Sequence, residues 1–249
     1  MTASNRFILA RRFEKPAMRI LLINPNSTAS MTEKIGASAV RYASPGTEIK
    51  AVNPTDAPAS IEGHFDEAMS LRGLLDEVRK GEAEGYDGFI VACFDDTGLG
   101  ACREIATGPV LGICEAGMHA ASMLATSFSV VTTLPRSVPI IENNALLYGM
   151  ERKCRRVRAA DIPVLALEEP GSDARERVRD EIDRARVEDG CEAVLLGCAG
   201  MADLTQWLTE QTGMPVIDGV VAATKMLEAL IGAGWKTSKI GAYARPRTK

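Results

Sequence analysis

Residues 85–93 read GYDGFIVAC, and residues 190–198 read GCEAVLLGC. Each segment opens with a glycine, continues through an apolar run typical of a buried parallel strand, and ends on a cysteine. These cysteines, Cys93 and Cys198, are 105 positions apart, and a charged helix-like stretch precedes each segment. The matching segments indicate that one structural unit occurs twice in the chain.

Two further pairs of segments support this repeat. PVLGICEAGMHAASML begins at Pro109, and PVIDGVVAATKMLEAL begins at Pro215. RILLINPNST at residues 19–28 has a weaker counterpart in FSVVTTLPRS at residues 128–137. The three pairs follow in the same order at nearly the same spacing, which predicts two similar lobes of roughly 100 residues each.

Short apolar runs alternate with helical stretches along the whole chain, which predicts an α/β fold with right-handed crossovers. We expect two pseudo-symmetric lobes, each a parallel four-stranded open sheet flanked by helices, with the active site in the cleft between them. The predicted strands cover residues 20–24, 48–52, 88–93, 110–113, 129–133, 163–166, 193–198 and 216–217. The predicted helices cover residues 31–42, 66–84, 117–125, 138–149, 173–188, 202–211 and 220–231. Ser30 and Glu33 have the spacing of a capping box at the first helix.

The repeat suggests a division of the chain. Residues 1–17 form an N-terminal extension that we expect to be disordered. Residues 18–117 form the first α/β lobe and residues 118–218 the second. Residues 219–249 form a C-terminal helix and tail, and we expect this helix to pack back on the first lobe.

The composition restricts the classes of function. The 249 residues are 46% hydrophobic and 25% charged, with a net charge of -4 and no dense basic run, which argues against a nucleic-acid partner. No apolar run is long enough for a membrane span, and residues 1–17 make a poor signal peptide. We therefore expect a cytoplasmic protein. There the six cysteines stay reduced, and the absence of a C-x-x-C motif argues against a zinc ribbon.

Cys93 and Cys198 each end a predicted strand, and ligands of open α/β sheets bind beyond these carboxyl ends. If the lobes face one another, the two thiols approach one cleft from opposite sides. Such a pair suits the inversion of a stereocentre, because a thiolate can remove a proton from one face while a thiol returns a proton to the other. Both cysteines lead toward a predicted helix start, which lowers the pKa of a thiol.

Polar loops at other strand ends add candidate contacts. Asn26, Ser27 and Thr28 follow the first strand, and Thr133 lies in the matching loop of the second lobe. Asp95 and Asp96 fit helix capping better than metal binding, and the only two histidines form no zinc motif. We therefore expect neither a metal nor another cofactor.

The motifs INPNST, ACFDDTGL, GICEAGMHAAS, FSVVTTLPRSVP and LLGCAGMADL together resemble the hydantoin racemases, over residues 18–232. That family includes allantoin racemase and belongs to the aspartate/glutamate racemase superfamily. The resemblance implies that Cys93 and Cys198 are the acid and base, that no cofactor is used, and that the subunits form a homo-oligomer, a tetramer or hexamer. It also implies a ring pocket lined by Asn26, Phe94, Asp95, Thr133, Ala199, Gly200, Asp218 and Gly219.

Two alternatives remain. One is an aspartate or glutamate racemase, or a maleate isomerase, of the same superfamily. It is disfavoured because no Arg or Lys follows Cys93 before Arg103 to bind a carboxylate. The other is a ligand-binding protein without catalysis, since two-lobed α/β folds also serve as sensors. Such a protein would not need two matched thiols.

Overall fold

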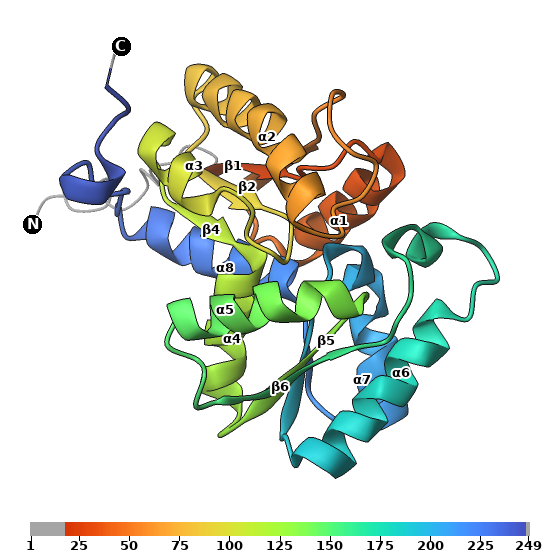
Figure 1. The fold of residues 1–249 in the computed structure, drawn as a ribbon. Coiled ribbons are helices and arrows are strands. Elements are labelled where there is room, and N and C mark those ends of the chain that lie inside the picture. Colours follow the sequence, from red (N-terminus) through yellow and green to blue (C-terminus); the bar gives the residue numbers. More distant parts are fainter. Residues whose placement is uncertain (1–17, 248–249) are drawn as a thin grey trace, which may run out of the picture.

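The computed structural model describes residues 18–247 and contains two four-stranded parallel sheets flanked by helices, which confirms the predicted fold class. The strand orders β2-β1-β3-β4 and β6-β5-β7-β8 repeat one connectivity (Figure 1). The first sheet comprises Met18–Ile23 (β1), Thr47–Val52 (β2), Gly88–Val91 (β3) and Val110–Gly112 (β4). The second comprises Phe128–Thr132 (β5), Cys154–Ala159 (β6), Ala193–Leu196 (β7) and Val216–Ile217 (β8). The predicted extension at 1–17 lies outside the described residues.

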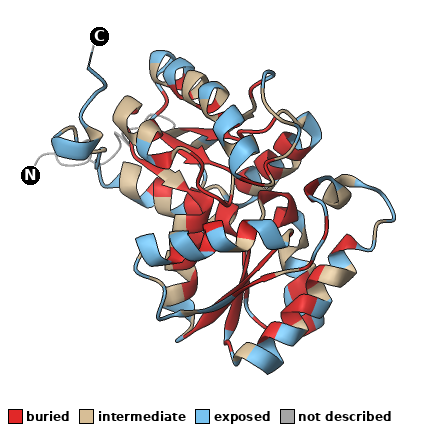
Figure 2. Cartoon of the chain, viewed as in Figure 1, coloured by how far each residue is buried: buried red, intermediate tan, exposed pale blue. Residues whose placement is uncertain are grey.

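Helices cover both faces of each sheet, so the inner strands are buried, whereas the edge strands β2 and β6 are partly exposed (Figure 2). The outer face of the first sheet packs against α2 (His64–Glu84) and α3 (Leu99–Ile105). The outer face of the second packs against α6 (Ala174–Arg184) and α7 (Thr205–Thr212). Between the sheets lie α1 (Ala29–Tyr42), α4 (Ile113–Leu124), α5 (Val138–Leu147) and α8 (Gly219–Gly232).

Helices α4 and α8 each pack on the sheet of the other lobe. Leu227 and Ile231 of α8 contact Gly88 in the first sheet, whereas Leu195 in the second sheet packs against Gly117 of α4. The predicted lobe boundary at residue 117 falls inside α4; the exact division of the chain stays a prediction.

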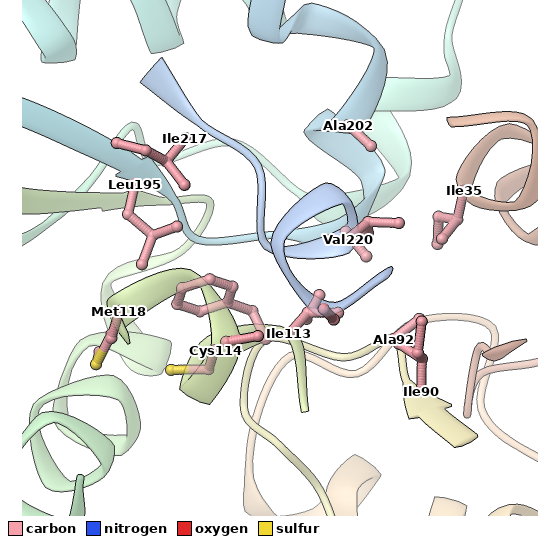
Figure 3. Close-up of a cluster of buried hydrophobic side chains, with 14 of the residues drawn as sticks. Ile35, Ile90, Ala92, Ile113, Cys114, Met118, Leu195, Ala202, Ile217 and Val220 are labelled. Carbon is pink, nitrogen blue, oxygen red and sulfur yellow. The ribbon is translucent and has the colours of Figure 1, made fainter. Parts of the chain in front are cut away.

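The exchanged helices join the two lobes in one hydrophobic core. Ile35 and Ile90 belong to the first lobe and Leu195 to the second, and all three are in one buried cluster with Ile113 and Val220 (Figure 3). Because this core is continuous, it holds the two lobes together beside the cleft.

One predicted strand is wrong. Residues 164–166 belong to a 3-10 helix, Val164–Glu168, which Pro163 precedes, and the edge strand beside β5 is instead β6. The arginines of β6 hid it from a search for apolar runs. In the fold, Arg158 is buried and its guanidinium contacts the carboxylates of Glu181, Glu188 and Asp189, which offset its charge.

The predicted capping box is also wrong. Helix α1 begins at Ala29, so Ser30 lies inside it. Thr28 is the N-cap residue, but its hydroxyl donates to the carbonyl of Ala59, 2.6 Å away, instead of capping the helix. The loop after β1 is thus tied to the loop that precedes α2. Helix α3 was not predicted, because it has only 7 residues and is too short to show a clear hydrophobic periodicity.

We predict that Gly219→Ala destabilises the protein by about 2 kcal/mol, because overpacked cores lose stability. A Cβ at this position would lie 2.3 Å from the carbonyl oxygen of Ile113, which is backbone and cannot move aside cheaply. Gly100→Ala is the control, since its added Cβ meets nothing within 4 Å. Urea unfolding of both variants measures the difference; equal midpoints would show that the α4–α8 contact is not tight.

Candidate active site

A pocket lies where the carboxyl ends of the two sheets face each other, and it has about 420 Å³ of space free of protein atoms, including its mouth. Cys93 and Cys198 both line it. Of the other predicted site residues, Asn26, Phe94, Asp95, Thr133 and Ala199 line it as well. The remaining lining residues are Asn24, Met31, Ile61, Ala92, Thr132, Ser137, Val164 and Gly197.

The two cysteines occupy corresponding places in the repeat. Each follows its strand by two residues, after β3 and β7 respectively. The ladder continues one residue past each strand: Ala92 donates to the carbonyl of Ile23, and Gly197 donates to that of Val131, each over 2.8 Å. These bonds hold the backbone just before both cysteines in place, and so they fix where each cysteine begins to line the pocket.

Burial governs the protonation of both thiols. It raises the pKa of Cys93 well above its ordinary value, and the nearby charge of Asp95 raises it further. It raises the pKa of Cys198 to about 11, although the backbone N–H of Gly200 lowers it. The expected lowering by helix starts is therefore outweighed. Cys93 is not at a helix start at all, since α3 begins only at Leu99.

A hydrogen-bonded loop after β1 forms one polar wall of the pocket. The Asn24 amide donates to Asn26 Oδ1 at 2.8 Å and to Thr32 Oγ1 at 3.0 Å. Asn26 Oδ1 also accepts from the N–H of Thr28 at 2.9 Å. Asn26 is thus a turn-forming residue as well as a lining residue, and its position is fixed by the start of α1.

The matching loop after β5 forms the opposite polar wall. Thr132 donates to the carbonyl of Gly197 at 2.8 Å and so braces the backbone just before Cys198. Thr133 and Ser137 also line the pocket, and each brings a hydroxyl group to it. They are therefore available to a ligand.

The two adjacent aspartates have different roles. Asp96 accepts from the N–H groups of Cys114 and Glu115 at the start of α4 and from the Tyr148 hydroxyl. It is a helix cap, as predicted, although the helix lies far along the chain. Asp95 lines the pocket; burial and the charge of Glu67 raise its pKa to about 7.

Three predicted site residues are not among the pocket-lining residues. Gly200 adjoins the site, because a Cβ there would lie 3.7 Å from the Sγ of Cys198. Asp218 caps α8 by accepting from the N–H of Val220 at 2.7 Å. Gly219 packs against the Ile113 carbonyl. Gly219 is thus part of the α4–α8 contact.

Sequence reasoning missed Met31, Ile61, Ser137 and Val164. Ser137 carried a signal, because it ends the segment that matches INPNST. Ile61 and Val164 carried none: they come from the loops after the two edge strands, and only the fold brings them over the pocket. The Oε1 of Glu62 accepts from the N–H of Val164 at 3.2 Å, which joins these two loops across the cleft.

The described part of the chain contains no group of three or more His, Cys, Asp or Glu side chains that could hold a metal ion. None of the helices within residues 18–247 is both long and apolar enough to cross a membrane.

Two repeated α/β lobes with a thiol from each at one pocket define the general class: a two-lobed α/β enzyme with its site between the lobes. The sequence profile of the Asp/Glu/Hydantoin racemase family matches residues 20–227, and the chain belongs to this family. It is therefore a racemase, an isomerase.

Individual relatives agree with this assignment. The hydantoin racemase of Rhizobium meliloti is 58% identical over 232 residues, which are 93% of this chain and 96% of that protein. The structure of allantoin racemase from Klebsiella pneumoniae has a TM-score of 0.91 at 52% identity and covers 93% of this chain and 95% of that chain. Glutamate racemase from Francisella tularensis, with a TM-score of 0.64 at 16% identity, covers 94% of this chain and 85% of that one and shares the fold.

The raised pKa of Asp95 makes stability depend on pH. Its pKa rises from 3.8 to about 7 on folding, so the folded state holds this proton more tightly and loses stability as pH rises through that window. We predict that Asp95→Asn increases the free energy of unfolding at pH 8 by about 2 kcal/mol, a gain that disappears near pH 4. Urea unfolding at both pH values checks this; a gain that is equal at both would contradict it.

Proposed function

We propose that this chain racemises 5-monosubstituted hydantoins or allantoin through an enolate, with Cys93 and Cys198 as acid and base and no cofactor. The observation that carries the proposal is that two thiols at corresponding repeat positions line one pocket. Inverting a carbon centre needs a proton acceptor on one face and a proton donor on the other, and two facing thiols provide both.

The proposed reaction balances within the two thiols and the ring. The thiolate of one cysteine takes the proton from ring carbon C5, and the C–H electron pair moves toward the adjacent carbonyl to give an enolate. The other thiol then gives its proton to the opposite face of C5. The product is the other enantiomer, and the two cysteines have exchanged protonation states, so the same site runs the reverse reaction.

The raised thiol pKa values suit this chemistry. A carbon acid next to a carbonyl is weak, and a base of higher pKa accepts its proton more readily. Exclusion of water from the pocket produces that basicity, since burial is the largest cause of both shifts. The cost is that few molecules carry a thiolate at neutral pH.

The developing enolate needs hydrogen-bond donors that are already in position. The hydroxyls of Thr133 and Ser137 and the backbone beside each cysteine supply candidates. Asp95 provides a carboxylate that can accept from a ring N–H. A planar ring with two carbonyls and two N–H groups matches such a mixed lining.

The charge of the pocket favours a neutral ring over a free amino acid. Among the described residues that line the pocket there is no Arg or Lys, whereas Asp95 adds a carboxyl group. The carboxylate of aspartate or glutamate would enter without a cationic partner, at a substantial desolvation cost. An assay of L-aspartate and L-glutamate turnover tests this alternative.

The choice between hydantoins and allantoin is an experimental one, because the relatives named above include both a hydantoin racemase and an allantoin racemase. A panel of single-enantiomer substrates, followed by loss of optical rotation, decides it. The homo-oligomer and the cytoplasmic location stay predictions; exposed apolar side chains at the ends of α4 and α5, including Leu124 and Leu147, offer one surface for self-association.

We predict that Cys93→Ala and Cys198→Ala each reduce racemisation by about a thousandfold or more, because each removes one of two proton-transfer groups. Cys154→Ala is the control: this thiol lies on β6 and does not line the pocket. Optical rotation and deuterium uptake at C5 in heavy water are the measurements. Racemisation retained in either pocket variant would overturn the two-base assignment.

We also predict an alkaline pH profile. The free enzyme needs one thiolate and one thiol, so kcat/KM rises as the first thiol loses its proton and falls when both are ionised. Since the pKa of Cys198 is about 11 and that of Cys93 is also raised, kcat/KM increases from pH 7 to pH 9. A flat profile over this range would contradict the thiol assignment or the burial that controls it.

A further inference from the structure

An ion pair crosses the cleft close to Cys198. Lys34 of α1, in the first lobe, extends to the 3-10 helix Val164–Glu168 of the second lobe. Its Nζ lies 2.7 Å from Oε1 of Glu168 and donates to the carbonyl of Leu167 at 3.2 Å. Both charged side chains are mostly buried, with 22% and 17% of their area exposed, so solvent screens the pair only partly.

Packing connects this ion pair to the Cys198 thiol. Gly200 lies between them: a Cβ there would be 3.2 Å from Leu167 Cδ1, 3.7 Å from Met31 Cε and 3.7 Å from Cys198 Sγ. Met31 is one turn before Lys34 on α1, so this face of the helix lies against the segment from Cys198 to Gly200. The N–H of Gly200 also lowers the pKa of that thiol.

The charges around Cys198 come from four other elements. Lys34 lies on α1 and Glu168 on the 3-10 helix of the second lobe. Asp203 lies in the 3-10 helix that follows Cys198, with its Oδ1 4.0 Å from Lys34 Nζ. Asp95, from the loop after β3, adds a carboxyl group whose charge raises the pKa of Cys198, and the Cys93 thiol faces it across the pocket. Lys34 is the only cation in this set.

We infer that Lys34 is a positioning residue for Cys198: its ammonium group favours the thiolate of this cysteine, and Glu168 opposes it. The ion pair therefore controls how readily one of the two thiols loses its proton. This inference rests on the acid–base role proposed above for Cys198. At Cys93 the main charge effect comes instead from the carboxyl group of Asp95, which raises the pKa of that thiol.

Glu168 has a particular part in this balance. Its Oε1 is buried, and within residues 18–247 it accepts no hydrogen bond of good geometry. The charge of Lys34 is thus its main compensation. Removing either partner leaves the charge of the other uncompensated near the thiol. Coulomb interactions of this kind change the pKa of the thiol: loss of the cation raises it, and loss of the anion lowers it.

The test measures the reactivity of each cysteine directly. Only a thiolate reacts with iodoacetamide, so the labelling rate at a fixed pH follows the thiolate fraction. Labelling of the full chain between pH 7 and pH 10, with mass spectrometry to separate Cys93 from Cys198, gives a rate for each residue. This readout does not depend on any substrate.

We expect Lys34→Met to slow labelling of Cys198 about threefold at pH 8, and Glu168→Gln to accelerate it about threefold, which corresponds to about half a pKa unit each way. Labelling of Cys93 stays within twofold of the parent in both. Lys34→Arg restores the parent rate, because it keeps the charge. A loss of structure would instead change the labelling rates of both cysteines in the same direction in both variants.

Arg41→Met is the matched control. Arg41 lies on the same helix and also reaches the second lobe, where its Nη2 donates to Gln206 at 3.3 Å. It is two turns beyond Lys34, about 10 Å along the helix, so its loss leaves Cys198 labelling unchanged. Thermal unfolding of all variants checks that they are folded.

The outcomes separate this inference from the proposed function. If Lys34→Met and Glu168→Gln change Cys198 labelling in the same direction, or not at all, the inference is wrong even if hydantoins are racemised. If the labelling shifts are opposite but no hydantoin or allantoin is racemised, the proposed function fails and the electrostatic role of Lys34 stands.

Discussion

The contact between α4 and α8 is the constraint on which the rest of the structure depends. These helices cross to each other's sheets and meet where Gly117 and Gly219 allow their backbones to approach closely. A larger residue at either position would push the lobes apart. Since each cysteine is anchored at the end of a strand, the separation of the sheets also fixes the separation of the two thiols.

The pocket formed in this way is rich in groups that hold protons. Burial raises the pKa of Cys93, Cys198 and Asp95 alike, which means that the folded chain keeps these groups in neutral forms that water would ionise more easily. Such a site sacrifices some stability at higher pH.

The fold is symmetric, but the electrical surroundings of the two thiols are not. Asp95 lies two residues after Cys93, whereas Cys198 lies near a cross-lobe pair of Lys34 and Glu168. In the proposed reaction one thiolate takes a proton from the substrate and the other thiol gives its own, so the two need not have identical surroundings. The repeat therefore accounts for the shared geometry, and the residues outside the repeated motifs account for the difference.

The sequence by itself determined the fold class and the repeat, because buried parallel strands leave continuous apolar runs and the two lobes retained them. It also singled out Cys93 and Cys198 among six cysteines and brought five further lining residues to notice, with the resemblance to a family as a guide. One edge strand of the second sheet was missed: β6 carries several arginines, and the charge of its buried Arg158 is offset by carboxylates distant in the chain.

Only the tertiary structure decided the contacts that cross between lobes. Ile61 and Val164 cover the pocket because two loops distant in sequence meet there, and no local pattern records that meeting. Asp218 caps α8 and Gly219 packs against Ile113, contacts that follow from the crossing of α8 to the other sheet; their predicted role at the ring stays a prediction. The thiol pKa values depend on burial, which outweighs any helix start and is a property of the packed molecule alone.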